Sequence, residues 1–432
     1  MAACLACTLA TIAVGAASTA HPHIKSAAAI GEVFGDGEKI TTVVLQYDKA
    51  IDNSRLLAKA FSVKGRTITR IYASRSAARS AHGGSGAFVV IELNPTDRSA
   101  SIRDGGPGPG GPGPGGPSGP GGGPMQMPVN KINPVQATVA QTGDLVATDG
   151  EKIAGQAAYF HTDKAVNRIV DDFQAFTFQD PKNGNRLTYN LFVPKGYDRA
   201  RKYPLVLFMP DASVTGNDPK LTLIQGLGAV VWGSPGDQAK HPALVLAPQF
   251  NTQIASDDFT TPNIIDTIER MVDHVATKYR VDRNRMYTTG QSGGCMMSLA
   301  LLIKYPNLFA AAMLVAGQWD PKATAALIHK PLWIVVSEGD IKAFPGMNAS
   351  IAVWEQNGAT IAKGRWSAQA PADQQAADVA KMAAQETNLH YTTYIQGTTF
   401  ANPSSGGMEH MNTWKFAYTI PGIRDWLFRQ SR

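Results

Sequence analysis

Short β-rich runs fill the first third of the chain. Residues 39–47, 66–72 and 88–93 are rich in Val, Ile, Thr and Tyr, and turn-forming residues separate them. Short strands with turns between them are typical of two packed antiparallel sheets. The pattern therefore predicts a β-sandwich over the segment 21–171.

From residue 172 onward, apolar runs alternate with helical stretches. Residues 176–178 and 187–193 flank Lys-Asn-Gly-Asn at 182–185, which predicts a hairpin with an Asn-Gly turn. The later strand candidates are 205–209, 243–247, 286–289, 311–315, 332–336 and 391–395, and the clearest helix candidates are 261–279 and 294–304. This alternation predicts a mostly parallel sheet with helices on both faces over 172–432.

Two segments show neither pattern. Residues 1–20 are apolar, uncharged and end in small side chains, which is typical of a secretory signal peptide although no Lys or Arg precedes the apolar run. Residues 104–124 are almost wholly Gly and Pro, a composition that cannot bury apolar surface and that predicts a disordered loop inside the front domain. Because of the predicted signal peptide, we expect a secreted or periplasmic protein.

Composition narrows the function classes. The net charge is +6, but the Lys and Arg residues are scattered, which argues against a nucleic-acid partner. Beyond the N-terminal segment, no apolar run is long enough to span a bilayer. Cys4 and Cys7 fall inside the predicted signal, so Cys295 would have no disulfide partner in the processed chain. The oligomeric state is left open.

The strongest chemical signal is a serine flanked by glycines. Gly-Gln-Ser-Gly-Gly at 290–294 follows a predicted strand and opens a predicted helix. A side chain at such a corner takes strained backbone angles, and small neighbours prevent clashes. The Ser292 hydroxyl would be held clear of the sheet, near the positive end of the helix. We predict Ser292 as a nucleophile and the amide of Gly293 as a donor to the oxyanion that its attack creates.

A serine nucleophile needs a base and an orienting carboxylate, and on a sheet of this kind they follow it in the order acid, then histidine. Asp340 lies just past the predicted strand 332–336, at the edge where parallel sheets place their sites. Glu338 and Asp320 are alternatives for the acid. Among nine histidines, His410 alone combines the right order with a position on a Gly-rich loop. With the serine, Asp340 and His410 form the predicted triad.

Several motifs in the second half of the chain point to one family. They are Val-Pro-Lys-Gly-Tyr at 193–197, Leu-Ala-Pro-Gln at 246–249, the serine motif at 290–294 and His-Met-Asn-Thr-Trp at 410–414. With them the chain resembles secreted esterases near polyhydroxybutyrate depolymerases and feruloyl esterases, and its front half is similar to the immunoglobulin-like domain that some of them carry. The resemblance implies an α/β-hydrolase fold behind a β-sandwich, and ester hydrolysis through an acyl-enzyme without metal or organic cofactor.

One departure from that family concerns the second oxyanion donor. Relatives usually have His-Gly after the third strand, whereas this chain has Pro210 and Asp211. Because proline has no amide hydrogen, the donor is predicted further on, at Ala212 or else at Ser213. The Asp211 carboxylate is expected to point away from the developing negative charge.

Further residues are predicted to line the acyl or alcohol pocket. Gln249 ends a strand at the correct edge of the sheet. The aromatic candidates lie on loops or beside catalytic residues, and they are Trp232, Trp319, Phe344 and Trp414. Together they favour an aromatic, bulky or polymeric ester as substrate. The Ala- and Gln-rich connection 344–388 is expected to form a helical lid or flank.

Two other function classes stay open. A serine peptidase would share the fold and the triad, but the front half is too short for the propeller that gates many oligopeptidases and lacks its blade repeats. A non-catalytic binding protein is supported only by the altered loop at Pro210 and Asp211. The sequence therefore favours a secreted serine esterase, and it leaves the acyl group and the alcohol undefined.

Overall fold

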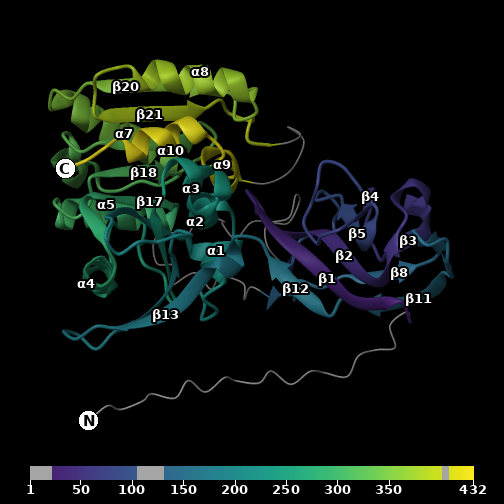
Figure 1. The fold of residues 1–432 in the computed structure, drawn as a ribbon. Coiled ribbons are helices and arrows are strands. Elements are labelled where there is room, and N and C mark those ends of the chain that lie inside the picture. The colour runs from purple at the N-terminus through teal and green to yellow at the C-terminus, as the bar shows by residue number, and fades with distance from the viewer. Residues whose placement is uncertain (1–21, 105–130, 401–407) are drawn as a thin grey trace, which may run out of the picture. The chain divides into compact units, whose positions relative to one another are not determined.

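The computed structural model of the protein describes residues 22–104, 131–400 and 408–432 (Figure 1). The predicted signal peptide and nearly all of the predicted Gly/Pro loop lie outside these residues. The chain divides into two compact units, one made of Met1–Gly31, Ile40–Ala100 and Pro134–Val166, the other of Glu32–Lys39, Ser101–Asn133 and Asn167–Arg432. Each unit is thus assembled from stretches that are separate in the sequence.

The first unit is built from strands. A five-stranded sheet has the order β12-β1-β2-β5-β4, with β1 at Ile24–Phe34, β2 at Gly37–Ile51, β4 at Ile68–Ser74, β5 at Gly86–Leu93 and β12 at Lys164–Asn167. A three-stranded sheet has the order β11-β8-β3, with β3 at Phe61–Val63, β8 at Thr138–Gln141 and β11 at Gln156–His161. Strands β2, β4 and β5 confirm the three β-rich runs of the sequence.

Apolar side chains and one buried polar contact hold these sheets. Ile30, Val44, Tyr72 and Val90 form a cluster on the larger sheet, where β-branched and aromatic residues pack well on a pleated surface. The buried hydroxyl of Tyr47 donates to a side-chain oxygen of the smaller sheet, on Gln141, at 2.9 Å. This pair of linked sheets agrees with the predicted sandwich.

Short elements complete this part of the chain. They are β6 (Arg103–Asp104) paired with β7 (Lys131–Ile132), β9 (Leu145–Val146) paired with β10 (Lys152–Ile153), and the 3-10 helices η1 (Asn53–Arg55), η2 (Ala58–Ala60) and η3 (Val170–Asp172). The strands β6 and β7 belong to the second unit.

A nine-stranded sheet dominates the second unit, with the order β13-β14-β16-β15-β17-β18-β19-β21-β20. Its strands are β13 (Phe173–Gln179), β14 (Arg186–Phe192), β15 (Tyr203–Met209), β16 (Leu244–Gln249), β17 (Val281–Gln291), β18 (Ala311–Val315), β19 (Leu332–Ser337), β20 (Ile361–Trp366) and β21 (Leu389–Tyr394). The hairpin β13–β14 and the pair β14–β16 are antiparallel, and the remaining pairs are parallel. The predicted hairpin and mostly parallel sheet are confirmed.

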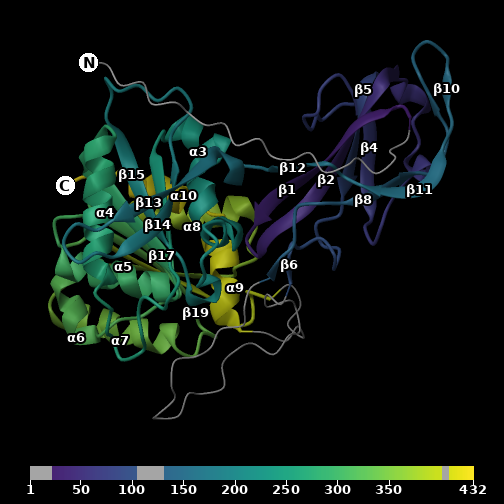
Figure 2. The ribbon, with the colours of Figure 1, turned by 90° about the horizontal axis from the view of Figure 1, so that it is seen from below.

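Helices lie on both sides of this sheet (Figures 1 and 2). They are α1 (Leu221–Ile224), α2 (Leu227–Val230), α3 (Pro235–Lys240), α4 (Ile264–Lys278), α5 (Gly293–Lys304), α6 (Pro321–Thr324), α7 (Ala343–Gln356), α8 (Ala372–Ala383), α9 (Glu409–Ala417) and α10 (Pro421–Phe428), with 3-10 turns η4 (Ala212–Val214), η5 (Val231–Gly233) and η6 (Ala325–Leu327). The larger core places α4, α5 and α7 against Leu205 and Leu207 of β15. On the opposite face, Trp333 of β19 packs against Trp426 of α10. Among the described residues, no helix has both the length and the apolarity needed to cross a membrane.

The connection 344–388 differs from its prediction. Instead of a lid it forms α7, the edge strand β20 and α8, and β20 pairs with β21 in parallel. Lys363, Gly364 and Arg365 interrupt the apolar pattern of β20. An edge strand needs fewer apolar residues than a central one, and therefore this strand gave no clear signal in the sequence. Helix α7 supplies the expected flank, since its Trp354 is fully buried in the core.

Candidate active site

Ser292 stands at a sharp corner between β17 and α5. Its φ of +52° is one that non-glycine residues rarely adopt. A Cβ placed on Gly290 would lie 2.4 Å from the carbonyl oxygen of Gly294, and one placed on Gly294 would lie 2.0 Å from the carbonyl oxygen of Met209. Both glycines are therefore sterically required, as predicted. The Ser292 amide donates to Val315 of the neighbouring strand at 3.0 Å, which fixes the corner to the sheet.

Three segments that follow strands at one edge of the sheet bring the predicted triad together. His410 Nε2 lies 2.9 Å from the Ser292 hydroxyl oxygen, and His410 Nδ1 lies 2.5 Å from a carboxylate oxygen of Asp340. Ser292 follows β17, Asp340 follows β19 and His410 comes after β21. The carboxyl ends of parallel strands meet at one edge of a sheet, so residues 70 and 118 positions apart can form one hydrogen-bonded chain.

The surroundings of Asp340 keep it ionised. Burial alone would raise the pKa of this carboxyl, but the hydrogen bond and charge of His410 and the amides of Ala343 and Lys342 lower the pKa below its ordinary value. These two amides, at the start of α7, donate to its second oxygen at 2.9 and 3.0 Å. Asp340 is thus a buried anion that faces the imidazole.

The alternative acids are engaged elsewhere. Glu338 binds the guanidinium of Arg365 through two hydrogen bonds of 2.6 and 2.9 Å. Asp320 caps α6 by accepting from the amide of Lys322 at 3.0 Å. The geometry therefore favours Asp340 over both as the partner of His410.

His410 lies in the first turn of α9 rather than on the loop that the sequence indicated. Its neighbour Glu409 is buried and accepts hydrogen bonds from the Ser337 hydroxyl and, at 2.8 Å, from the Gly397 amide. Gly339 makes room for this carboxylate, because a Cβ there would lie 2.0 Å from it. Glu409 therefore ties the start of α9 to the ends of β19 and β21. Sequence reasoning missed it, although a carboxylate next to the candidate base was a visible signal.

The two predicted oxyanion donors lie close together. A Cβ placed on Gly293 would lie 4.0 Å from the amide nitrogen of Ala212. The Ser213 amide, the alternative donor, is occupied by a 2.8 Å bond to Asp211. Within the part of the chain that the structure describes, neither the Ala212 nor the Gly293 amide donates a hydrogen bond. Both are therefore available to an incoming oxygen.

Asp211 links the two sides of this arrangement. One carboxylate oxygen accepts from the Ser213 amide, and the other accepts from the side-chain amide of Gln291 at 2.7 Å. Asp211 is 6% exposed and Gln291 is fully buried. The carboxylate thus joins the loop that carries Ala212 to the residue just before Ser292.

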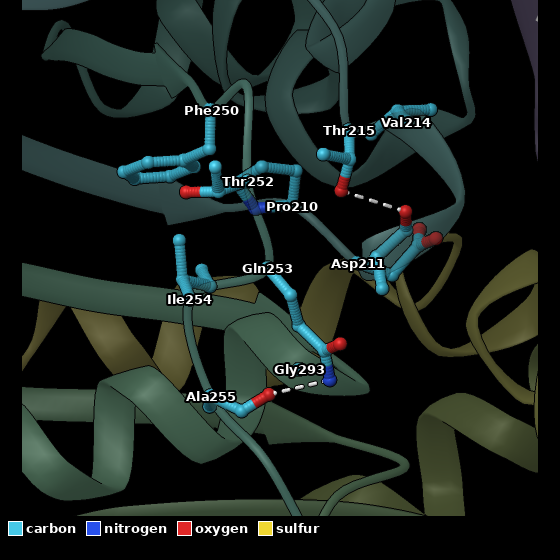
Figure 3. Close-up of a pocket in the computed structure, with 11 residues that line it drawn as sticks. Pro210, Asp211, Val214, Thr215, Phe250, Thr252, Gln253, Ile254, Ala255 and Gly293 are labelled. Atoms are coloured by element: carbon cyan, nitrogen blue, oxygen red, sulfur yellow. Dashed lines mark hydrogen bonds between the residues drawn. The ribbon is translucent and has the colours of Figure 1, made fainter. Parts of the chain in front are cut away.

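A small cavity lies beside Gly293 (Figure 3), and its enclosed volume of about 10 Å³ is roughly what one water molecule needs. Its lining residues are Pro210, Asp211, Ala212, Val214, Thr215, Phe250, Thr252, Gln253, Ile254, Ala255 and Gly293. Thr215 donates to the carbonyl of Ala212 at 2.9 Å, and Gln253 donates to the carbonyl of Ala255 at 2.8 Å. These bonds hold the two loops that form the walls, so the cavity has a defined shape.

Two predicted pocket residues are structural instead. Gln249 is buried, and its side chain donates to Val214 and Gly216 at 2.7 and 3.0 Å, so its polar group supports the oxyanion loop. Trp232 has no exposed surface, and its indole N–H donates to the Gly228 carbonyl at 2.8 Å. A side chain without exposed surface cannot contact substrate. The prediction for Trp232 was therefore wrong, and that for Gln249 is replaced by a supporting role.

The other aromatic candidates surround the site without lining this cavity. Trp414 lies on α9 with its ring edge-to-face with His410, at a centroid distance of 5.3 Å. Trp319 is 6% exposed and contacts Phe259 on a neighbouring loop. Phe344 is half-buried in α7 against the core. Of these rings, Trp414 supports the predicted base.

Family comparison agrees with this fold and site. The model described as "Esterase Ig-like N-terminal domain" matches residues 26–154, and the one described as "Putative esterase" matches residues 182–415, more than half of the chain. The chain belongs to the "Putative esterase" family. This confirms the resemblance to esterases with an immunoglobulin-like front domain, and with it the α/β-hydrolase fold.

Individual relatives give the same assignment. The crystal structure of a thermostable esterase has a TM-score of 0.77 and 27% identity, and the match covers 94% of this chain and 100% of that one. Acetylxylan esterase A of Emericella nidulans is 44% identical over 52 residues, which are 12% of this chain and 17% of that enzyme. Poly(3-hydroxyalkanoate) depolymerase C of Paucimonas lemoignei is 27% identical over 99 residues, 20% of this chain and 24% of that enzyme. This chain thus matches a quarter or less of the length of these two curated relatives.

Proposed function

We propose that the protein is a secreted serine hydrolase of carboxylic esters, acting through an acyl-enzyme on the triad Ser292, Asp340 and His410. The observation that carries this proposal is the continuous hydrogen-bonded chain from the Ser292 hydroxyl through His410 to Asp340, with distances of 2.9 and 2.5 Å. A nucleophile, a base and an orienting carboxylate in this order are what acyl transfer to serine requires.

The geometry supports the following sequence of steps. Ser292 attacks the ester carbonyl while His410 Nε2 takes its proton, and Asp340 stabilises the imidazolium that forms. The amides of Ala212 and Gly293 donate to the oxyanion of the tetrahedral intermediate. His410 then gives its proton to the leaving alcohol, which produces the acyl-enzyme. A water molecule, deprotonated by the same imidazole, releases the acid and restores the serine.

The oxyanion loop bears on the alternative of a non-catalytic protein. That alternative rested on Pro210 and Asp211, which replace the usual residues of the loop. Pro210 cannot donate, but the amide nitrogen of Ala212 lies close to Gly293 and has no hydrogen-bond acceptor among the described residues, so it is the donor we propose in its place. The loop therefore supports a catalytic role despite its unusual sequence.

The small cavity beside Gly293 restricts the size of any group on that side of the ester. Val214, Phe250, Ile254 and Ala255 contribute apolar surface to its wall, but the enclosed volume of about 10 Å³ is no more than a water molecule needs. The names of the relatives, an acetylxylan esterase and a poly(3-hydroxyalkanoate) depolymerase, are compatible with a small or polymeric ester.

Hydrolysis of p-nitrophenyl acetate and butyrate by the native protein and by Ser292→Ala tests the proposal. We expect measurable turnover by the native protein and a loss of about 10³-fold or more in the variant, because triad members act as a unit. The melting temperature of the variant should stay near the native value, which serves as the folding control. Full activity of Ser292→Ala, or no turnover of any ester by the native protein, would overturn the proposal.

Secretion is tested separately. We propose cleavage of the signal before His21, on the grounds of the sequence of residues 1–20 alone. Expression of the full chain followed by intact-mass measurement of extracellular and periplasmic protein should give a form that begins at His21. Recovery of the uncut chain from the cytoplasm only would contradict this.

A further inference from the structure

Two large apolar side chains of the second unit are exposed on loops next to the proposed site. Across the described residues, large exposed hydrophobic side chains of this unit are limited to Phe259, at 37% exposure, and Ile341, at 87%. Ile341 follows Asp340 directly. Phe259 lies on the loop after β16, a few residues beyond Thr252 and Ala255, which line the cavity of Figure 3. A single exposed hydrophobic residue is ordinary, but two beside one site indicate a binding surface.

Phe259 is held in an unusual backbone conformation. Its φ of +62° lies in the left-handed region, which is unfavourable for a bulky side chain and free of strain for glycine. A tight turn maintains it, with the Phe259 amide donating to Ser256 at 3.0 Å and the Thr260 hydroxyl donating to Asp258 at 2.7 Å. Backbone strain of this kind clusters at active sites and ligand-binding segments.

The ring of Phe259 rests on Trp319. The two centroids are 5.9 Å apart with an interplanar angle of 62°, and Trp319 is almost fully covered. Trp319 is two residues after Gly317, where a Cβ would lie 3.0 Å from the carbonyl oxygen of Ser292. Phe259 therefore contacts Trp319, and the loop that carries Trp319 packs close to the backbone of Ser292.

Asp257 connects this turn to both neighbouring loops. It accepts from the Gln318 side chain at 3.3 Å and from the Lys342 ammonium at 2.6 Å. Lys342 follows Ile341, so one ion pair holds the loops of Phe259 and Ile341 to each other. The pair neutralises the lysine, whereas the exposed carboxylate of Asp258, whose pKa is lowered by hydrogen bonds from Ser256 and Thr260, leaves a negative charge next to Phe259 in the chain.

We propose that Phe259 and Ile341, with Trp319 packed against Phe259, form an apolar platform for an aryl or long aliphatic group of the ester whose carbonyl is attacked by Ser292. The platform extends the proposed function by naming the substrate class, and it rests on that function. Apolar side chains favour a hydrocarbon or aromatic group over a sugar, and the Asp258 carboxylate beside Phe259 disfavours an anion. The small cavity beside Gly293 has no room for such a group, so we place it on the platform outside that cavity.

Phe259→Gly gives a sharp test, because it removes the ring and the backbone strain together. We expect kcat/KM to fall at least fivefold for ethyl octanoate, ethyl cinnamate or benzyl acetate, and to stay within twofold for ethyl acetate, measured by titration of the released acid. Ethyl octanoate and ethyl cinnamate carry a large acyl group, whereas benzyl acetate carries a large alcohol group. The substrates whose kcat/KM falls therefore show whether the acyl or the alcohol group occupies the platform. The melting temperature should be unchanged or higher.

Ile341→Ser is the second variant. Its side chain is almost fully exposed, so the substitution cannot disrupt the core, and it should produce the same selective loss. Leu57→Ser, which removes an exposed leucine of the first unit, is the matched control and should change none of the rates.

Loss on every ester alike in both platform variants, or no loss on any bulky ester, overturns the platform. Loss confined to bulky esters supports it. Ser292→Ala, assayed on ethyl acetate in the same series, reports on the proposed function by itself, because retained activity there would refute the nucleophile and not the platform.

Discussion

Ser292 takes a strained backbone angle because glycines on both sides let β15 and α5 approach it closely. This requirement is local, and therefore a five-residue motif was enough to predict the corner from sequence. The contacts of Asp211 with Gln291 and of Glu409 with Ser337 join residues 80 and 72 positions apart. No local pattern encodes such pairs, so the sequence could not supply them.

Removal of the proposed base should abolish most of the activity. His410→Ala is expected to lower kcat by about 10³-fold or more, since the serine would lose its proton acceptor. Steady-state kinetics on p-nitrophenyl butyrate measure this. Arg365→Ala is the control. It removes the ion-pair partner of Glu338, the alternative acid, and should leave kcat near the native value. A mild effect of His410→Ala would mean that another group is the base.

Asp211 should act by hydrogen bonding and not by charge. Asp211→Ala removes the acceptor of the Ser213 amide and the nearer acceptor of the Gln291 side chain, which keeps only Gln225 at 3.3 Å. The Ala212 amide would then lose its position, and kcat would fall roughly 10- to 100-fold at similar KM. Asp211→Asn can keep both bonds if the Gln291 amide turns over, and it should retain kcat within about threefold of native. Equal losses in the two variants would show that the charge itself matters.

At the scale of elements, hydrophobic periodicity predicted the central strands well. Strands buried on both faces, such as β15 and β18, are continuous apolar runs that stand out in any sequence. The edge strand β20 and the buried Trp232 were interpreted wrongly for one reason. Whether a residue is covered depends on what the rest of the chain places over it, and neither its type nor its neighbours reveal that.

Gly294→Ala should test the tight packing of α5 on β15. The new Cβ would lie 2.0 Å from a backbone oxygen of Met209, so we expect a loss of at least about 3 kcal/mol in the free energy of unfolding. Gly236→Ala in α3 is the control, because nothing lies within 4 Å of its Cβ position and alanine should stabilise a helix by roughly 0.5–1 kcal/mol. Urea titrations of the two variants should therefore shift in opposite directions.

At the scale of the whole molecule, a buried histidine couples stability to pH. His390 is 1% exposed and stacks on Trp333 at 4.5 Å, and burial lowers its pKa from the ordinary 6.5 to about 4. Between about pH 6.5 and pH 4, His390 is therefore protonated in the unfolded chain and neutral in the folded chain. Stability should be full at neutral pH and decline as the pH falls toward 4, by about 2 kcal/mol at pH 5 from this residue.

The variant His390→Gln provides the measurement. Urea unfolding at pH 7.5 and pH 5 should show a smaller drop in the free energy of unfolding for the variant than for the native protein. Equal drops in both would show that His390 does not carry this dependence.

The distance along the chain between Ser292 and His410 has a consequence for the timing of activity. The base can reach the nucleophile only after β18, β19 and β21 have joined the sheet and α9 has packed on β19. Contacts of such long sequence separation form slowly, because the loop between them must close first. We expect a partly folded chain to be inert toward esters even when most of its sheet exists. A protein that folds only after crossing the membrane would then not hydrolyse esters inside the cell that makes it. In refolding experiments, esterase activity should return with the slowest phase of tryptophan fluorescence.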